Sequence, residues 1–331
     1  MTYEEKLQQY KDWIFRRSAY QMALAIISID KQTVAPSAGA AYRDERSAYL
    51  AGELFSIETD PAMVQLLKEL KDDPQIDGDN KRAVELYYKQ AMDTMCIPKE
   101  EFVAYQKLRD ESFDAWIKAK SQSDYSIFEP YLKKIIEVSK KMYRYRNSDK
   151  NLYDQMLDDY EPGMTQEKYD VFFAALKERL VPLIQKITQA KQKNEAFLHQ
   201  EFPIEDQKKF MTQLLEYLHF DSSWGYQNES EHPFTSWTCE NDCRTTTKYV
   251  KNDVVSAVLS TVHEVGHAYY EHDVDPKYDG MILSEGISSC MHESQSRLCE
   301  NYLARTTAFW TYHYPKLQET FPTQLGNVSF D

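Results

Sequence analysis

The chain has 331 residues, a formal net charge of −14 and 42% hydrophobic residues. This length is enough for a substantial core in one large domain or two lobes. The acidic balance argues against binding to nucleic acid or to an anionic membrane, because both would need clustered Lys and Arg. The sequence has only nine glycines and neither a GxGxxG nor a GxxxxGK[ST] string, which excludes the usual phosphate-binding loops.

The amino terminus and the cysteines indicate a reducing, cytoplasmic setting. The first five residues are acidic rather than basic, and the apolar run at about residues 22–29 is too short to span a bilayer. Five cysteines in so long a chain do not suggest a disulfide framework. Cys239 and Cys243 could supply half of a structural zinc site, but no second cysteine pair completes it.

The chain before His219 is predicted to be mostly helical. It is rich in Ala, Leu, Glu, Lys and Gln, which lose little side-chain freedom in a helix. Thr2 and Glu5 have the form of a capping box, and Pro61 follows Asp60 at a first-turn position. We expect helices at about residues 2–29, 36–55, 60 onward, 79–95, 99–120, 125–146, 166–200 (disturbed near Pro182) and 205–218.

The character of the sequence changes after His219. Residues 221–250 contain Gly225, Pro233 and the β-branched run Thr245-Thr246-Thr247, which predicts a loop with a short β-ribbon. Helices are expected again at about residues 253–272, 282–303 and 307–320. Seven of the eight histidines lie at or after His219, so metal or proton chemistry is expected in this third of the chain.

The main chemical signal is the string His263-Glu264-Val265-Gly266-His267. Residues four apart lie on one face of a helix, so both imidazoles can reach one metal ion. Glu264 is placed to reach a water molecule on that ion. Apolar residues just before the string predict a buried helix face, and a dry wall strengthens the field of an ion at a reacting carbonyl.

Glu293 is the predicted third ligand. A catalytic zinc ion normally takes three protein ligands and keeps a fourth position for water. The loop around Gly280 would let the helix that carries Glu293 turn back beside the first one. The alternative is an exposed ion pair with Arg297 at i, i+4, and the residues alone favour neither interpretation.

Four motifs then occur in a characteristic order. They are His232-Pro233-Phe234, an Asp-x-Arg-x-Thr pattern at residues 242–246, His263 to His267, and His292-Glu293-Ser294-Gln295. Together with residues 29–36, they resemble the carboxypeptidase Taq family of zinc metallocarboxypeptidases. The resemblance implies an all-α, mainly helical fold with a small β-ribbon and a deep cleft, similar to neurolysin and angiotensin-converting enzyme.

The resemblance also implies roles for the site residues. His263, His267 and Glu293 would bind zinc, and Glu264 would be the catalytic carboxylate. Cobalt or another divalent ion could replace zinc in such a site. The implied reaction removes residues from the carboxyl end of a peptide, in a protein that forms a homodimer and binds neither nucleic acid nor membrane.

Two family motifs, Ile-Arg-x-x-Ala-Asp and Gly-x-x-Gln-Asp-x-His-Trp, do not occur in these 331 residues. The sequence therefore resembles a family member without its carboxyl-terminal third, and its substrate site is expected to be less complete than its metal site. Residues 1–204 are expected to form one wall of the cleft, and residues 205–331 to hold the metal. Two alternatives remain open: a non-catalytic metal- and peptide-binding protein, and an endopeptidase or dipeptidyl-peptidase of the same cleft fold.

Two residues are candidates for binding substrate. An exopeptidase must recognise a free carboxylate, and the guanidinium fork of Arg244 could bind both of its oxygens. The alternative for Arg244 is an ion pair with Asp242. His232 either lines the cleft near the metal or holds the turn at Pro233. His292 is expected to support a ligand or to pack, because it points away from the ligand face of its helix.

Overall fold

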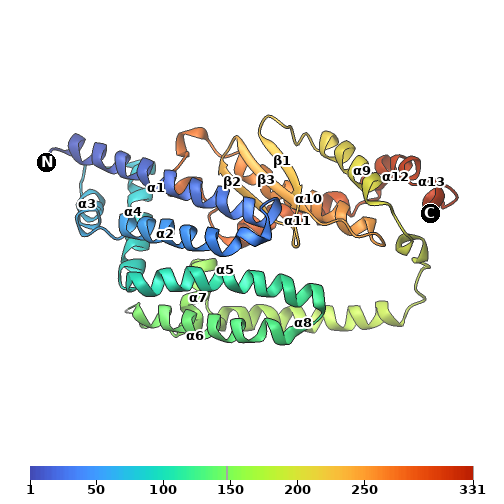
Figure 1. Cartoon of the computed structure of the whole chain (residues 1–331), viewed down its shortest axis with the longest axis horizontal. Helices are drawn as coiled ribbons and strands as arrows, with labels where there is room; N and C mark the ends of the chain where they lie inside the picture. Colours follow the sequence, from blue (N-terminus) through green and yellow to red (C-terminus); the bar gives the residue numbers. More distant parts are fainter. Residues whose placement is uncertain (147, 331) are drawn as a thin grey trace. The chain divides into compact units, whose positions relative to one another are not determined.

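The computed structural model describes residues 1–146 and 148–330. It is mainly helical with one small sheet, as predicted (Figure 1). The chain divides into two compact units. The first comprises Met1–Asp149, Ser236–Glu240 and Asp273–Glu285, and the second comprises Lys150–Thr235, Asn241–His272 and Gly286–Asp331. The predicted roles of residues 1–204 and 205–331 remain a prediction.

The first unit is mainly helical, and its first four helices pack around aromatic and leucine side chains. Tyr10, Trp13, Leu67, Leu70 and Tyr87 belong to this core, and the rings of Trp13 and Tyr87 meet edge to face at 4.9 Å. The predicted capping box is confirmed, because Thr2 and Glu5 exchange side-chain to backbone hydrogen bonds. The helices are α1 (Tyr3–Thr33), α2 (Ala40–Glu58), α3 (Pro61–Lys71), α4 (Gly78–Met95), α5 (Lys99–Gln122) and α6 (Glu129–Tyr145).

The second unit carries the remaining helices and most of the sheet. Strand β1 (Gly225–Glu229) pairs in parallel with β3 (Asp242–Thr247), with Gly225 opposite Cys243. The strand order is β1-β3-β2, and β2 (Thr235–Cys239) begins in this unit at Thr235. The helices are α7 (Leu152–Tyr160), α8 (Gln166–Gln189), α9 (Ile204–Tyr217), α10 (Val254–His272), α11 (Ser289–Arg297), a π-helix (Leu298–Ala304), α12 (Thr307–Thr320) and α13 (Pro322–Leu325).

Most predicted helices are confirmed to within a few residues, but two boundaries are wrong. Helix α8 passes through Pro182 and ends at Gln189, because the side chain of Gln192 donates to the carbonyls of Ile187 and Ala190 and so caps the helix. The helix expected from residue 282 begins only at Ser289, where the hydroxyl of Ser288 accepts from the Met291 amide.

The far end of the same helix, predicted at about residue 303, is confirmed, but its last stretch, Leu298–Ala304, is a π-helix. Helix α7 was not predicted at all. Its amino-terminal signal is Asn151, whose side-chain oxygen accepts from the Asp154 amide at 2.8 Å. In the described residues, no helix combines the length and the hydropathy that a membrane span requires.

Helix α10 is the best-buried helix of the second unit, and it lies against β3 and α11. Its buried apolar side chains include Val258, Val262 and Val265. At Gly266 the two helices come so close that a Cβ atom would lie 2.8 Å from the Ser296 Cα and 2.9 Å from the Gln295 carbonyl oxygen. A glycine is needed here because backbone, which cannot rotate away, would meet any larger residue.

We therefore expect Gly266→Ala to destabilise the protein by about 1–3 kcal/mol, the usual cost of overpacking a close contact. On an exposed helix the same change would stabilise by about 1 kcal/mol, because alanine favours helix more than glycine does. Denaturant unfolding measures the difference. The control is Ser256→Ala on the exposed side of the same helix, and a Gly266→Ala variant more stable than wild type would contradict the packing argument.

Candidate metal centre

Three predicted ligands converge between α10 and α11. His263 and His267 lie one turn apart on α10, and Glu293 lies on α11. Glu293 Oε2 is 3.6 Å from His263 Nε2 and 3.4 Å from His267 Nε2. Donor atoms about 2.0–2.1 Å from a tetrahedral zinc ion are separated by about 3.3 Å, so these spacings fit a divalent ion between them.

The outer nitrogen of each imidazole has a partner as well. His263 Nδ1 lies 2.9 Å from Oε2 of Glu300, a buried residue of the π-helix. His267 Nδ1 lies 2.6 Å from His292 Nδ1, and His292 Nε2 lies 2.6 Å from Glu271 Oε1. A hydrogen-bonded Nδ1 on each ligand leaves Nε2 facing the site, which is the arrangement that metal-binding histidines adopt.

His267 is suited to bind a cation at neutral pH. Burial, together with the nearby His292 and His263, lowers the pKa of His267 to about 4. A neutral imidazole has a lone pair to offer, whereas an imidazolium has none. The expectation that His292 supports a ligand agrees with its position between His267 and Glu271.

Glu293 pairs with Arg297 and at the same time faces the two histidines. Its Oε1 accepts from Arg297 Nε at 2.8 Å, while Oε2 faces the two histidines. Partial burial raises the pKa of Glu293. The hydrogen bond from Arg297, with the nearby His263 and His267, outweighs this effect and brings the pKa below its usual value. The carboxylate is therefore ionised at neutral pH, as a ligand must be.

Glu264 lies next to this group in a drier environment. Only 5% of its surface is exposed, and Thr235 Oγ1 donates to its Oε2 at 2.7 Å. Burial raises the pKa of Glu264, against the opposing effects of the Thr235 hydrogen bond and of His263. A carboxylate with a raised pKa is a better proton acceptor than a solvated one, and such groups gather at active sites.

A pocket of about 700 Å³ opens beside the converging side chains. His232, His263, Glu264 and Glu293 all line it. Arg244 is not among the lining residues, and its Nε and Nη2 bind the two oxygens of Asp242 at 2.7 and 2.8 Å. The ion-pair alternative for Arg244 is thus present in the structure.

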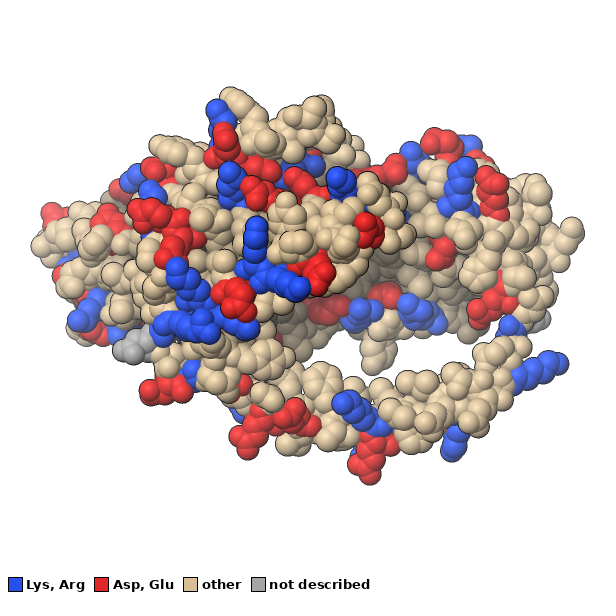
Figure 2. Space-filling view, turned by 60° about the horizontal axis from the view of Figure 1, so that its bottom comes forward, with Lys and Arg blue, Asp and Glu red and all other residues tan. Residues whose placement is uncertain are grey.

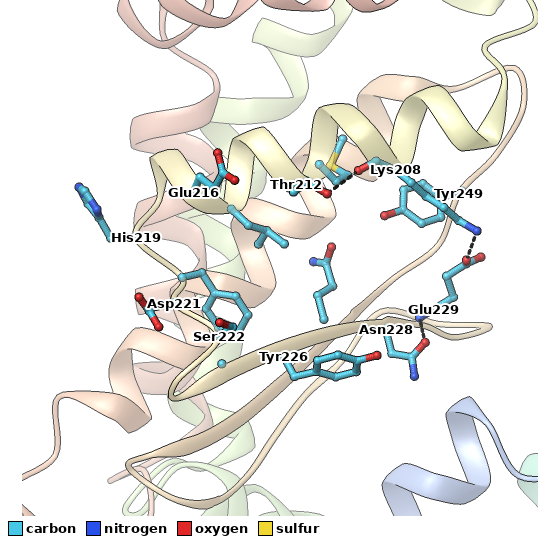
Figure 3. Close-up of a pocket in the computed structure, with 15 residues that line it drawn as sticks. Lys208, Thr212, Glu216, His219, Asp221, Ser222, Tyr226, Asn228, Glu229 and Tyr249 are labelled. Carbon is cyan, nitrogen blue, oxygen red and sulfur yellow. Dashed lines mark hydrogen bonds and ion pairs between the residues drawn. The ribbon is translucent and has the colours of Figure 1, made fainter.

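A second pocket, of about 780 Å³, lies between α9 and β1 in the same unit (Figure 3). Lys208 of α9 reaches across it to Glu229 of β1, with Nζ 2.9 Å from Oε1. None of the predicted site residues lines this pocket. On the face drawn in Figure 2, many basic and acidic side chains lie next to one another.

A further group of possible donors lies in the first unit, at Cys239, Glu240 and Asp279. Burial and the neighbouring Glu240 raise the pKa of Asp279 to about 6. This shift is typical of two carboxyl groups that share a proton. Cys243 belongs to the second unit, where it is buried and its thiol lies 3.7 Å from the Ala268 carbonyl oxygen.

Sequence reasoning missed three residues that support the centre: Glu300, Glu271 and Thr235. Glu300 follows Glu293 by seven residues, so the two share one helix face, and this spacing could have indicated it. Glu271 follows His267 at i+4 in the same way. Thr235 comes from a different element, and nothing in the local sequence connects it with Glu264.

We expect Glu293→Gln to weaken zinc binding by more than the about 10–100-fold that loss of a supporting residue costs, because a charged ligand is removed. Arg297→Met breaks the Arg297–Glu293 ion pair and keeps the carboxylate, so it should weaken zinc binding much less, with only the small loss that follows from its contact to Glu300. Chelator competition measures both affinities. If the ion pair were the only role of Glu293, zinc affinity would be unchanged in both variants.

Comparisons with known proteins identify a family of metallopeptidases. Residues 9–331 match the family model described as carboxypeptidase Taq (M32) metallopeptidase. The chain is 37% identical over 332 residues to carboxypeptidase 1 of Bacillus subtilis strain 168, covering 100% of this chain and 66% of that protein. It is 31% identical to thermostable carboxypeptidase 1 of Thermus thermophilus, covering 96% of this chain and 64% of that protein.

The fold is similar to a solved structure as well. "BsuCP Crystal Structure" superposes with a TM-score of 0.95 at 36% identity, over 98% of this chain and 66% of that one. The chain thus spans just under two thirds of the length of these relatives. The family model covers nearly all of the sequence and implies a divalent metal ion, for which the donor set at His263, His267 and Glu293 is suited. The chain belongs to the carboxypeptidase Taq family of metallopeptidases.

Proposed function

We propose that this chain is a zinc-dependent carboxypeptidase that hydrolyses the last peptide bond of a peptide. The observation that carries the proposal is a buried carboxylate, Glu264, next to two imidazole nitrogens and a carboxylate oxygen that are spaced for one divalent ion. Family membership supports the same reaction class. A homodimer is a part of the proposal that rests on the resemblance, and a cytoplasmic location is a part that rests on the small, odd number of cysteines.

His263, His267 and Glu293 would hold the ion, and when bound it lowers the pKa of a water molecule to about 7 and polarises the carbonyl under attack. Glu264 is the proton acceptor of the reaction. Thr235 binds its Oε2, which leaves Oε1 to take the proton from the attacking water and to pass it to the leaving amine. The apolar face of α10 keeps the reaction away from bulk water and strengthens these charges.

Recognition of the terminal carboxylate is assigned to Arg244, with His232 lining the cleft. Arg244 would have to exchange its pairing with Asp242 for the substrate carboxylate, or to bind it with its remaining N–H groups. The existing pair is the observation that favours the alternative function, an endopeptidase or dipeptidyl-peptidase, which does not need a cation for a terminal carboxylate at this place.

We expect Glu264→Gln to keep its zinc content and to lose hydrolysis by at least about 100-fold, because an amide cannot accept the proton. Mass spectrometry of a mixed peptide set measures both rate and products. Single residues lost stepwise from the carboxyl end identify a carboxypeptidase, while internal fragments or released dipeptides identify the alternative. Chelated wild type is the control without metal. Activity of Glu264→Gln equal to wild type would refute the mechanism.

We expect Arg244→Ala to raise KM for peptides with a free carboxyl end by about 10-fold or more, since a charged hydrogen bond contributes about 1.5–3 kcal/mol. Peptides with an amidated end should be affected far less. Asp242→Asn is the companion variant, since it weakens the same ion pair and keeps the guanidinium. Equal effects of Arg244→Ala on both kinds of peptide would exclude a role in recognising the carboxylate.

A further inference from the structure

Glu300 is a buried carboxylate whose two oxygens contact three side chains. It is 7% exposed and accepts from Arg305 Nη2 at 2.7 Å through Oε1. Its other oxygen, Oε2, lies 2.9 Å from Arg297 Nη1 and 2.9 Å from His263 Nδ1. Two guanidinium groups therefore fix the position of one carboxylate, and that carboxylate touches a predicted metal ligand.

The chemistry of this contact determines where the proton of His263 lies. Each oxygen of Glu300 accepts from a guanidinium group, and two such charge-assisted hydrogen bonds hold the carboxyl group in its ionised form. An ionised carboxylate can only accept hydrogen bonds. The short contact to His263 therefore requires a hydrogen on Nδ1, and a neutral imidazole then has its lone pair on Nε2, which faces Glu293.

We propose that Glu300 is a positioning residue for the metal centre: clamped by Arg297 and Arg305, it holds His263 as the Nδ1–H tautomer with Nε2 directed at the ion. This inference rests on the proposed function. It goes beyond the ligands and the proton acceptor, because it assigns the order of the centre to a residue of the π-helix that is not one of the three ligands.

His267 provides an internal comparison. Its Nδ1 contacts His292 rather than a carboxylate, and the proton order in that chain is fixed by Glu271 at the far end. Removing Glu300 leaves this chain intact. A loss of order confined to His263 therefore separates the proposed role from a general loosening of α10.

The test uses the full chain labelled with ¹⁵N at histidine. Glu300→Met removes the acceptor at similar side-chain length, and Glu300→Gln restores a carbonyl oxygen. Long-range ¹H–¹⁵N spectra of the metal-free protein report the tautomer of each histidine. Chelator competition gives zinc affinity, and the visible spectrum of the cobalt-loaded protein reports ligand geometry. Glu319→Gln, an exposed glutamate on α12, controls for the lost charge.

In wild type we expect His263 and His267 both to carry the proton on Nδ1. In Glu300→Met, His263 alone should populate the other tautomer, zinc affinity should fall by about 10–100-fold, and the cobalt spectrum should change. Glu300→Gln should recover part of the affinity. A purely structural role would lower the stability of the metal-free protein and leave the tautomer and the cobalt spectrum as they are, which would overturn the inference.

If Glu300→Met does not fold, Arg305→Met tests the same point, because Arg305 contacts Glu300 and Asn301 but neither histidine ligand. The expected loss of zinc affinity is smaller, about 3–10-fold, since one of the two clamps remains; an unchanged affinity and tautomer would overturn the inference. Wild type that takes up no metal would refute the proposed function, and this inference with it. Wild type that binds zinc, with Glu300 variants that bind it equally well, would refute the inference alone.

Discussion

The structure of the metal centre depends on the close approach of α10 and α11. Two imidazoles one turn apart on a helix can reach one ion by themselves, but the third ligand must come from elsewhere. Gly266 permits the backbone of α11 to pack directly on α10, and this contact brings Glu293 Oε2 within 3.6 Å of both Nε2 atoms. The metal ligands are therefore a consequence of helix packing as much as of the motif.

The charges around this contact are arranged in two layers. The inner layer consists of the three ligands and Glu264. Burial raises the pKa of Glu264, and the hydrogen bond from Thr235 opposes that rise. The outer layer consists of Glu300 with its two arginines and of the His292–Glu271 pair. Every ligand has a partner on the side away from the site, so its side chain is already oriented and loses little conformational entropy when an ion binds.

Much of this could be predicted from the sequence, because the signals are local. The His263–His267 spacing holds both imidazoles on one helix face whatever surrounds it, and the capping box at Thr2 and Glu5 depends on four neighbouring residues. The ordered motifs that resemble the carboxypeptidase Taq family favoured Glu293 as a metal ligand over Glu293 as a surface ion pair. In the structure its carboxylate faces His267 and also pairs with Arg297.

The rest depends on contacts that no local pattern reveals. Helix α8 ends at Gln189 because the side chain of Gln192 caps it, although the sequence pattern predicted helix to about residue 200. Thr235 reaches Glu264 only because the first residue of β2 comes to lie against α10. Glu300 lies in a π-helix, and its seven-residue spacing from Glu293 alone does not reveal the contact with His263.

X-ray absorption of the zinc-loaded chain at the zinc edge identifies the atoms around the ion. We expect a zinc ion with two imidazole nitrogens and oxygen donors at about 2.0–2.1 Å. A sulfur shell at about 2.3 Å would locate the ion at a cysteine instead, and a chain that retains no zinc would leave the convergence of His263, His267 and Glu293 without its proposed purpose.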